Sequence, residues 1–553
     1  MSLATEFDKA QILLEADEFV TRYNLHDSRD LIRKGALLSY DPHDYARVDG
    51  LSEDEITALQ NGNVDRPSRL WLFCVLAGLL YVLLGISLPP DDFSIFWGAS
   101  SGHFRMVLSV AIPLLEHPLV GLLSNCIGRR QALCTASILA ILRACLAILL
   151  KRFQYWLLPG FAALFVDRLL AGVALATLSF NMPLHLAESV PAPVRGRAMV
   201  FWPLVLGAFE FPLRSLLLWA SIPLYQYVTR VHISIIPVAA SLILSLRYMT
   251  LESPYQLVAR GHIASALQTL YKSRLSKIVA ARDLYRIYAT SSFESSLASQ
   301  SARRATTYSI TFMLTRALII SPELLTEHLL NRPETDISRL TLMISSKGFG
   351  LGAIAIIWYW TDCDRLGERR FMLLRVLIMQ LLYLILPLDP YVYDSLVYFC
   401  IQIALSVGLS VVTMVYAVEV FPYSCRDQGY AITVSVYNIV RVVMQIIGSQ
   451  PSYPSRYPDG DPRHLDCFIA LYRAIQKYTI PIVSVLTWVF MRETAKIPLE
   501  DMEKLFEARN RDILLYQVKI VWPYLFKKYI FWQNVVLEPF DESRYGTSAI
   551  ALV

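Results

Sequence analysis

The chain has 553 residues, of which 55% are hydrophobic and only 18% charged, and its mean hydropathy is +0.43. A soluble core of this size cannot bury so many apolar side chains, so the composition indicates an integral membrane protein. The net charge of +5 is small, and the basic residues lie beside apolar segments, which argues against nucleic-acid binding.

The first 69 residues are polar, and we expect them to form a cytoplasmic N-terminal region with short helices. They contain no basic segment followed by a short apolar one, so no cleavable signal peptide is predicted and the first span would serve as the signal. The eight cysteines are scattered singly, without disulfide or zinc-ligand spacing. No metal or cofactor is therefore expected.

Apolar segments next predict an all-α membrane protein with twelve transmembrane helices. A spanning helix needs about 20 largely apolar residues. Such segments lie at approximately 70–88, 106–124, 132–150, 168–187, 198–219, 230–249, 307–329, 340–360, 371–388, 395–418, 428–448 and 470–491. They predict two pseudo-symmetric six-helix bundles at 70–249 and 307–491, a cytoplasmic linker at 250–306 and a cytoplasmic tail at 492–553.

Basic residues set the expected orientation. Most of those that flank spans fall on one side, which the positive-inside rule makes cytoplasmic, whereas Lys151, Arg152 and Arg230 fall on the other. An even number of spans then leaves both termini in the cytoplasm, and the plasma membrane is the expected location.

The linker between the bundles carries apolar residues three and four apart, as in ARDLYRIY (Ala281–Tyr288). This spacing predicts two or three amphipathic helices that lie under the membrane. A partly ordered linker is the alternative.

A short pattern occurs once in each half of the chain. GLLSNCIGRR (Gly121–Arg130) is followed by LAESVPAPVRGR (Leu186–Arg197), and TDCDRLGERR (Thr361–Arg370) is followed by AVEVFPYSCRDQG (Ala417–Gly429). Both copies pair a Gly and Arg loop with Glu-x-x-Pro-x-x-x-Arg, and they are offset by nearly half the chain. Such a duplication in an apolar chain is typical of a two-bundle secondary transporter with its site between the halves.

The repeated charges predict a cytoplasmic gate. Loop arginines can reach carboxylates at neighbouring helix ends, in pairs that form when the cytoplasmic side closes and break when it opens. Loop arginines that only set topology are the alternative. The candidate gate residues are Arg129, Arg130, Glu188, Arg195, Asp364, Arg369, Arg370, Glu419, Arg426 and Glu493.

These motifs resemble those of the sugar porter family in the major facilitator superfamily. The resemblance covers about 70–506 and rests also on LESPYQLVARG (Leu251–Gly261) and RETAKIPLEDMEKLF (Arg492–Phe506). KGALLSYDP (Lys34–Pro42), ARDLYRIY and VWPYLFKKYIF (Val521–Phe531) resemble a large fungal branch of these porters. The resemblance implies the major facilitator fold and a carrier of small polar solutes.

The chain differs from this family at the positions where the family binds sugar. Amides that offer both donors and acceptors suit a polyhydroxylated ligand, but the family's fifth-span Gln falls at Pro203, beside Trp202. Its Asn-Trp pair of the tenth or eleventh span falls near Tyr437 and Asn438, without the indole, and its seventh-span amides fall where Arg316 lies. The resemblance therefore marks a divergent member, with Trp202, Arg316, Tyr437 and Asn438 as candidate substrate contacts.

Charges inside the spans suggest further roles, because a charge in the membrane should face a cavity or a partner. Glu116 and His117 are candidates for proton coupling, since His titrates near neutral pH. Arg316 would favour an anionic or carboxylated ligand. The alternative is that these charges reach the membrane surface, pair with each other, or persist after transport was lost.

Enzyme activity is not expected, because the chain has neither a nucleotide-binding P-loop nor a hydrolase motif. The predicted function is secondary-active or facilitative transport of a small polar organic solute, sugar-like or polyol-like, by alternating access. The expected partners are this solute, the lipid bilayer and protons. The alternatives are an exporter of a fungal metabolite or organic acid, and a transport-inactive nutrient receptor.

Overall fold

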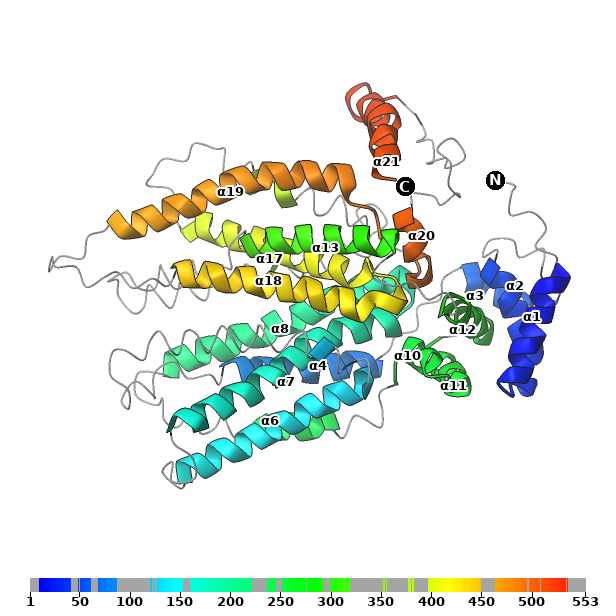
Figure 1. Ribbon diagram of the computed structural model, residues 1–553, viewed down its shortest axis with the longest axis horizontal. Coiled ribbons are helices and arrows are strands. Elements are labelled where there is room, and N and C mark those ends of the chain that lie inside the picture. Colours follow the sequence, from blue (N-terminus) through cyan, green and yellow to red (C-terminus); the bar gives the residue numbers. More distant parts are fainter. Residues whose placement is uncertain are drawn as a thin grey trace.

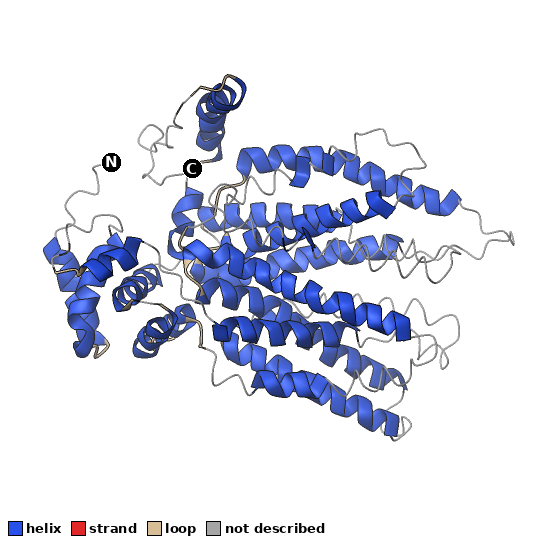
Figure 2. Ribbon diagram, turned by 180° about the vertical axis from the view of Figure 1, so that it is seen from behind, coloured by secondary structure: helices blue, strands red, loops and turns tan. Residues whose placement is uncertain are grey.

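The computed structural model describes residues 9–40, 48, 50–60, 68–86, 120–121, 124, 127–152, 160–220, 236–244, 251–274, 276–291, 299–318, 352–353, 355, 376–378, 380–381, 396–448, 463–494, 497–507, 509–533 and 535. Over these residues every regular element is a helix, as Figure 2 shows. The all-α prediction is confirmed for this part of the chain.

Long helices lie side by side in two groups (Figure 1). The first half contributes α4 (Ser68–Ile86), α6 (Arg129–Arg152), α7 (Gly160–Ser189) and α8 (Ala192–Ala220). The second half contributes α13 (Gln300–Leu318), α17 (Leu396–Glu419), α18 (Arg426–Gly448) and α19 (Arg463–Phe490), with the short η3 (Tyr423–Cys425) before α18. We call these groups the first and second bundles.

Two described helices are long and apolar enough to cross a membrane, over Arg129–Leu149 and Phe165–Ser189. Val407–Glu419 and Tyr423–Arg441 pass the same test together, with a bend of 109° between them. Leu70–Leu84 and Lys477–Phe490 form shorter apolar helices. All of these segments coincide with predicted spans.

Two apolar cores hold the bundles together. One lies within the first bundle, where Phe73 and Leu80 of α4 meet Leu133 of α6 and Leu178 of α7. The other joins residues of both bundles, including Phe180 of α7 and Tyr416 of α17. The second core therefore packs the two halves of the chain against each other.

Several helices begin before the predicted spans. α13 begins at Gln300 rather than at 307, because its polar first turns continue beyond the apolar segment. Arg304 in these turns donates to the backbone carbonyls of Phe506 and Glu507, at 2.9 and 2.7 Å. Contacts outside the apolar segment thus extend the helix.

The linker forms three helices, α10 (Pro254–Ala259), α11 (Ile263–Ser273) and α12 (Lys277–Ser291), at one end of the bundles (Figure 1). We call this the linker end. The N-terminal helices α1 (Lys9–Arg22), α2 (Arg29–Tyr40) and α3 (Glu53–Gln60), with the short η1 (His26–Ser28), lie there too. Their apolar faces share a core with α10–α12, which orders the N-terminal region as a cap on the linker.

The segment after α19 ties the linker to the second bundle. It contains η4 (Leu499–Asp501) and α20 (Met502–Glu507). The Tyr255 hydroxyl of α10 donates to Glu500 at 2.5 Å, and Arg286 of α12 pairs with Asp501. The chain continues through α21 (Asn510–Tyr516), η5 (Gln517–Val521), α22 (Trp522–Leu525) and η6 (Phe526–Ile530).

Candidate functional site

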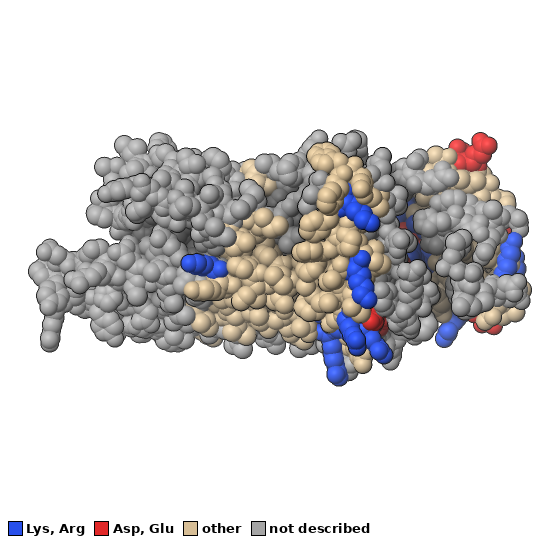
Figure 3. Space-filling view, turned by 90° about the horizontal axis from the view of Figure 1, so that it is seen from above, with Lys and Arg blue, Asp and Glu red and all other residues tan. Residues whose placement is uncertain are grey.

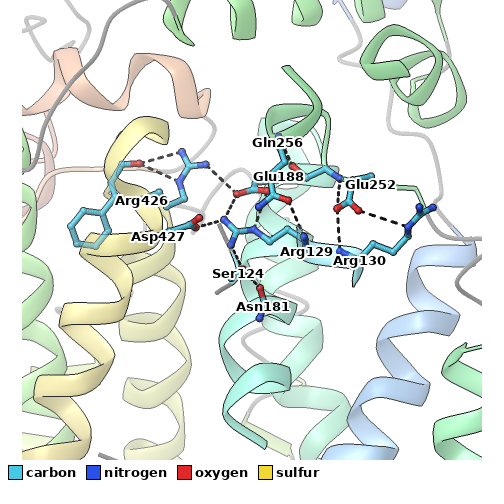
Figure 4. A network of polar contacts seen from close by, with 11 residues as sticks. Ser124, Arg129, Arg130, Asn181, Glu188, Glu252, Gln256, Arg426 and Asp427 are labelled. Carbon is cyan, nitrogen blue, oxygen red and sulfur yellow. Dashed lines mark hydrogen bonds and ion pairs between the residues drawn. The ribbon is translucent and has the colours of Figure 1, made fainter. Parts of the chain in front are cut away.

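A buried arginine at the start of α6 is the centre of a polar network at the linker end (Figure 4). Gly128 precedes it with a φ of 103°, a left-handed conformation that favours glycine. This turn presents the backbone N–H of Arg129 to the side-chain oxygen of Gln256, at 2.8 Å. The linker helix α10 thus holds the first turn of α6.

The Arg129 side chain is 1% exposed and has a partner for each nitrogen. Its Nη2 lies 2.9 Å from Oε1 of Glu188, and its Nε donates to Oε2 of the same carboxylate at 3.4 Å. Its Nη1 donates to the Ser124 hydroxyl at 2.8 Å, and that hydroxyl donates to Asn181. These partners compensate the buried guanidinium, because an unpaired charge is costly to bury.

The network crosses from the first bundle to the second. Nη2 of Arg129 also donates to the carboxylate of Asp427 in the first turn of α18. In return, Nη1 of Arg426 lies 3.9 Å from Oε1 of Glu188, while its Nε and Nη2 donate to the Phe421 carbonyl at 3.3 and 3.2 Å. Each bundle therefore contributes one arginine and one carboxylate.

Close packing accompanies the network. The rings of Phe180 and Tyr430, from opposite bundles, have centroids 5.1 Å apart. A Cβ on Gly121 would lie only 2.7 Å from the Cβ of Ala431. The two bundles thus meet without a gap at this point, and the linker end is closed there.

Two other predicted gate residues of the first half hold neighbouring segments. The Arg130 backbone N–H donates to Glu252 at 3.1 Å, and its Nε lies 3.8 Å from the same carboxylate. Arg195 donates to the carbonyls of Ala187 and Ile497, at 3.1 and 3.0 Å. Burial lowers the pKa of Arg195 to about 10, which leaves it charged at neutral pH.

The second copy of the pattern is described only in part. Glu419 is fully buried and accepts a hydrogen bond from the Thr494 hydroxyl at 3.0 Å. Glu493, which precedes Thr494 in the sequence, is half-buried. Asp364, Arg369 and Arg370 lie outside the described residues, so the expected pairing of Glu419 with these arginines stays a prediction.

The structure brings together two of the predicted substrate contacts. The guanidinium of Arg316, on α13, lies 4.6 Å from the centre of the Tyr437 ring, on α18. Its Nε is buried and has no hydrogen-bond partner in the described part of the chain. Asn438 is buried beside Tyr437. An arginine stacked on a tyrosine can still donate to a ligand in the plane of its fork.

The other predicted contacts lie elsewhere. Trp202 is 2% exposed and packs in the core of the first bundle, with its ring 6.0 Å from that of Tyr81 on α4. The structure therefore does not group it with Arg316 and Tyr437. Glu116 and His117 lie outside the described residues.

Sequence reasoning missed the residues that complete the network: Ser124, Asn181, Glu252, Gln256 and Asp427. A signal for Asp427 was present in the repeat itself. The first copy reads Arg195-Gly196, whereas the second reads Arg426-Asp427, so the second copy has an acid directly after the repeated arginine.

Comparisons with known proteins find a transporter family model and transporter structures. A family model described as "Sugar (and other) transporter" matches residues 117–506. A double-tryptophan variant of XylE has a TM-score of 0.66 at 18% identity, over 79% of this chain and 98% of that one. The proton:xylose symporter XylE bound to 6-bromo-6-deoxy-D-glucose gives 0.65 at 16% identity, over the same 79% and 98%.

A partially occluded, inward-open form of the xylose transporter XylE from E. coli has a TM-score of 0.53 at 17% identity, over 77% of this chain and 98% of that one. No curated protein matches the sequence. The structural likeness establishes the fold, which is that of these two-bundle transporters, as the sequence predicts.

Proposed function

The chain belongs to the sugar (and other) transporter family, and from this premise we propose that it moves a small polar organic solute across a membrane by alternating access. Membership of this family makes it an integral membrane protein and a transporter rather than an enzyme. A sugar-like or polyol-like solute is the proposed substrate class. The structural neighbour that is a proton:xylose symporter, bound to a deoxyglucose derivative, supports this class.

One observation carries the alternating-access proposal: the Arg129, Glu188, Arg426 and Asp427 network that joins the bundles. We propose that this network is the gate at the linker end. The pairs Arg129–Asp427 and Glu188–Arg426 join opposite bundles and must break when that end opens, whereas Arg129–Glu188 lies within one bundle. The proposed gate therefore consists of the two pairs between the bundles, which form when the linker end is closed and break when it is open.

The charge distribution of the network makes opening feasible. After separation the first bundle keeps Arg129 with Glu188, and the second keeps Arg426 with Asp427. Neither bundle then carries an uncompensated charge, which would cost several kcal/mol to leave buried. The closed and open states can therefore differ by only a few kcal/mol, as a cycling carrier requires.

The linker end is the proposed cytoplasmic side, and both termini would lie there. Basic residues that flank the spans gather on this side, which supports the assignment by the positive-inside rule. The plasma membrane is the proposed location. Labelling of introduced cysteines from each side of intact cells would test the orientation.

Arg316, Tyr437 and Asn438 are the proposed substrate contacts in the second bundle, and Trp202 the proposed contact in the first. The unpartnered Nε of Arg316 supports its role, because a ligand oxygen would satisfy it. Glu116 and His117 are the proposed proton-coupling pair. Glu116→Gln should flatten the pH dependence of uptake, and an unaltered pH profile would refute the pair.

The experiment that tests the function is uptake by proteoliposomes that contain only this protein. The panel should include sugars, polyols and carboxylates, so that an organic-acid carrier is recognised. Saturable flux of a sugar or polyol is the expected result. Binding without flux of any member would instead indicate a transport-inactive receptor and would overturn the proposal.

A further inference from the structure

The segment after α20 folds into a continuous helix that belongs to neither bundle. It runs through α21, η5, α22 and η6, from Asn510 to Ile530. Figures 1 and 2 show that it lies beside the linker end of α19 and runs across the direction of the long helices. A helix in this position lies along a membrane surface if the long helices cross the membrane.

The start of this helix is fixed to the second bundle. The Asn510 side-chain oxygen accepts hydrogen bonds from the Tyr308 hydroxyl at 2.6 Å and from Nη2 of Arg492 at 3.3 Å. Ile513 and Tyr516 are buried on the side that faces the protein. The position of the helix is therefore set by contacts with α13 and with the residues that follow α19.

Its outer side carries an exposed apolar stripe. Leu514, Val518, Trp522 and Phe526 are 36%, 50%, 45% and 44% exposed. A four-residue spacing would drift around a regular α-helix of 3.6 residues per turn, but the wider π-turn of η5, which lies between Leu514 and Trp522, offsets part of this drift. A contiguous apolar surface of this kind indicates an interaction site.

The stripe continues the lipid-facing surface of α19. Tyr478, Ile482 and Val485 follow one face of α19 and are 68%, 60% and 59% exposed, as expected of side chains that contact lipid. Trp488 is the next residue along this face, and its ring lies 5.2 Å from that of Trp522. The two apolar surfaces thus meet at the linker end.

Basic side chains accompany the stripe. The face formed by α19 and the 509–533 segment carries Lys and Arg at its linker end, as Figure 3 shows from above. Asp512 is the acid of this segment, whereas its exposed basic residues are Arg509, Arg511, Lys519, Lys527 and Lys528. Positive charge next to an apolar stripe is suited to the anionic headgroups of a cytoplasmic leaflet.

We propose that residues 509–533 form an interfacial helix that binds the cytoplasmic surface of the bilayer. Leu514, Val518, Trp522 and Phe526 enter the boundary between headgroups and acyl chains, and the basic side chains contact anionic headgroups. The proposal rests on the family assignment and on the cytoplasmic orientation of the linker end, but not on the substrate. It fixes the end of the second bundle at a defined depth in the membrane.

A second copy of this chain fits the stripe less well. Two such helices placed face to face would bring Lys519, Lys527 and Lys528 of each copy toward the same charges of the other. Like charges at short range oppose association, whereas anionic lipid compensates them. The charge therefore favours a membrane surface over self-association.

The test is hydrogen exchange of the full-length protein in nanodiscs that hold one copy each. The discs contain either phosphatidylcholine alone or phosphatidylcholine with phosphatidylserine. The test variant carries Val518→Glu and Trp522→Glu. Leu14→Glu is the matched control, because Leu14 is 59% exposed on α1, away from the long helices.

We expect amides of 509–533 to exchange about tenfold faster in the test variant than in the natural protein or the control, because an anchored helix opens less often. Phosphatidylserine should slow exchange further, and Lys519→Gln with Lys527→Gln and Lys528→Gln should abolish only that extra effect. Equal exchange in the natural protein and the test variant would overturn the proposal.

Two further results are decisive. Protection that appears only in discs with two copies would identify self-association and overturn the proposal. If the test variant also loses protection in α19, the contact between Trp522 and Trp488 has been disturbed. Phe526→Glu, which lies beyond that contact, then decides: faster exchange confined to 509–533 supports the membrane anchor, and unchanged exchange overturns it.

Discussion

Arg129 of the first bundle donates a hydrogen bond to the carboxylate of Asp427 in the second, although the two residues lie far apart in the sequence. Both side chains are buried, and Glu188 and Arg426 complete a charge-balanced group around them. If this group is the proposed gate, closure of the linker end depends on these four side chains. Substitutions of these side chains can test the proposed gate directly.

Asp427→Asn should shift the protein toward a state with the linker end open. The change leaves two buried arginines facing Glu188 alone, and breaking a buried pair in this way costs roughly 3–5 kcal/mol. Distances between spin labels at Gln131 and Gln428, which are exposed on α6 and α18, report the separation of the bundles. We expect the longer distances to become the major population.

Two variants control this measurement. Asp30→Asn removes an exposed acid from α2 and should leave the distances unchanged. Arg129→Gln combined with Asp427→Asn leaves Arg426 facing Glu188, so charge balance and much of the closed population should return. If Asp427→Asn alone leaves the distances as they were, the network is not a gate.

Gly121→Ala should also favour the open linker end, for a steric reason. The new Cβ would lie 2.7 Å from the Cβ of Ala431, so the bundles must move apart, at a cost of about 1–3 kcal/mol. The same label pair measures the shift, and Ala431→Gly in addition should reverse it. Gly352→Ala is the matched control, because no neighbouring atom of the described residues lies within 4 Å of a Cβ added there.

Gly128→Ala should lower the thermal stability of the protein. A left-handed backbone costs a residue with a side chain about 1–2 kcal/mol, and the new Cβ would lie 3.1 Å from Arg260 and 3.3 Å from Gln256. Gly261 also has a positive φ, of 76°, but no neighbouring atom of the described part of the chain lies within 4 Å of a Cβ added there. A thermal shift assay should therefore show a larger loss for Gly128→Ala than for Gly261→Ala; equal losses would mean that crowding contributes nothing.

Acid should loosen the N-terminal cap through Asp17. Side-chain hydrogen bonds from Arg29, at 2.9 and 3.0 Å, and from Arg33 hold the pKa of Asp17 well below its usual value. The folded pKa lies below the unfolded value of about 3.9, so the stabilisation is complete above that pH and is lost as the pH falls toward the folded value.

Hydrogen exchange of α1 and α2 between pH 5 and pH 3, corrected for intrinsic rates, measures this effect. Protection should fall across this range in the natural protein, and Asp17→Asn should be less protected at pH 5 and show a weaker pH dependence. Asp27→Asn, at an exposed acid of the same region, is the control. An identical pH profile for Asp17→Asn would contradict the assignment.

Arg316→Gln should change the choice of ligand without harming the fold. The guanidinium stacks on Tyr437, and a neutral amide cannot provide the same cationic fork to a ligand oxygen. Uptake across a panel of sugars, polyols and carboxylates measures the change, and Arg303→Gln, at an exposed site on the same helix, is the control. Unchanged selectivity would remove Arg316 from the substrate site.

Much of the fold was predictable because long apolar segments have few alternatives in a bilayer, where backbone groups must be paired within helices. The family was predictable from the repeated Arg and Glu patterns. Their spacing also suggested that Arg129 could reach Glu188, since a loop arginine and a helix-end acid on the same side of a bundle lie close together. These inferences depend on local pattern and on one boundary condition, the membrane.

Other parts of the site depended on contacts between segments distant in the sequence. Asp427 follows a predicted gate arginine, but nothing in its own neighbourhood shows that it meets Arg129. Gln256, on a linker helix, holds the start of α6 through a backbone contact that leaves no periodic signal. Trp202 matches a family position, and only the structure shows that its ring packs near Tyr81 of α4 in the core of the first bundle.

The sequence by itself determined the class of this protein, since its composition requires a membrane and its duplicated motifs require two related halves. Only the tertiary structure decided which charges meet: one arginine and one carboxylate from each bundle, buried together with the linker end closed. The tertiary structure also decides how the tail helix is oriented, because the contact between Trp522 and Trp488 places its apolar residues beside α19. Composition and period are properties of a segment, whereas pairing is a property of the packed chain.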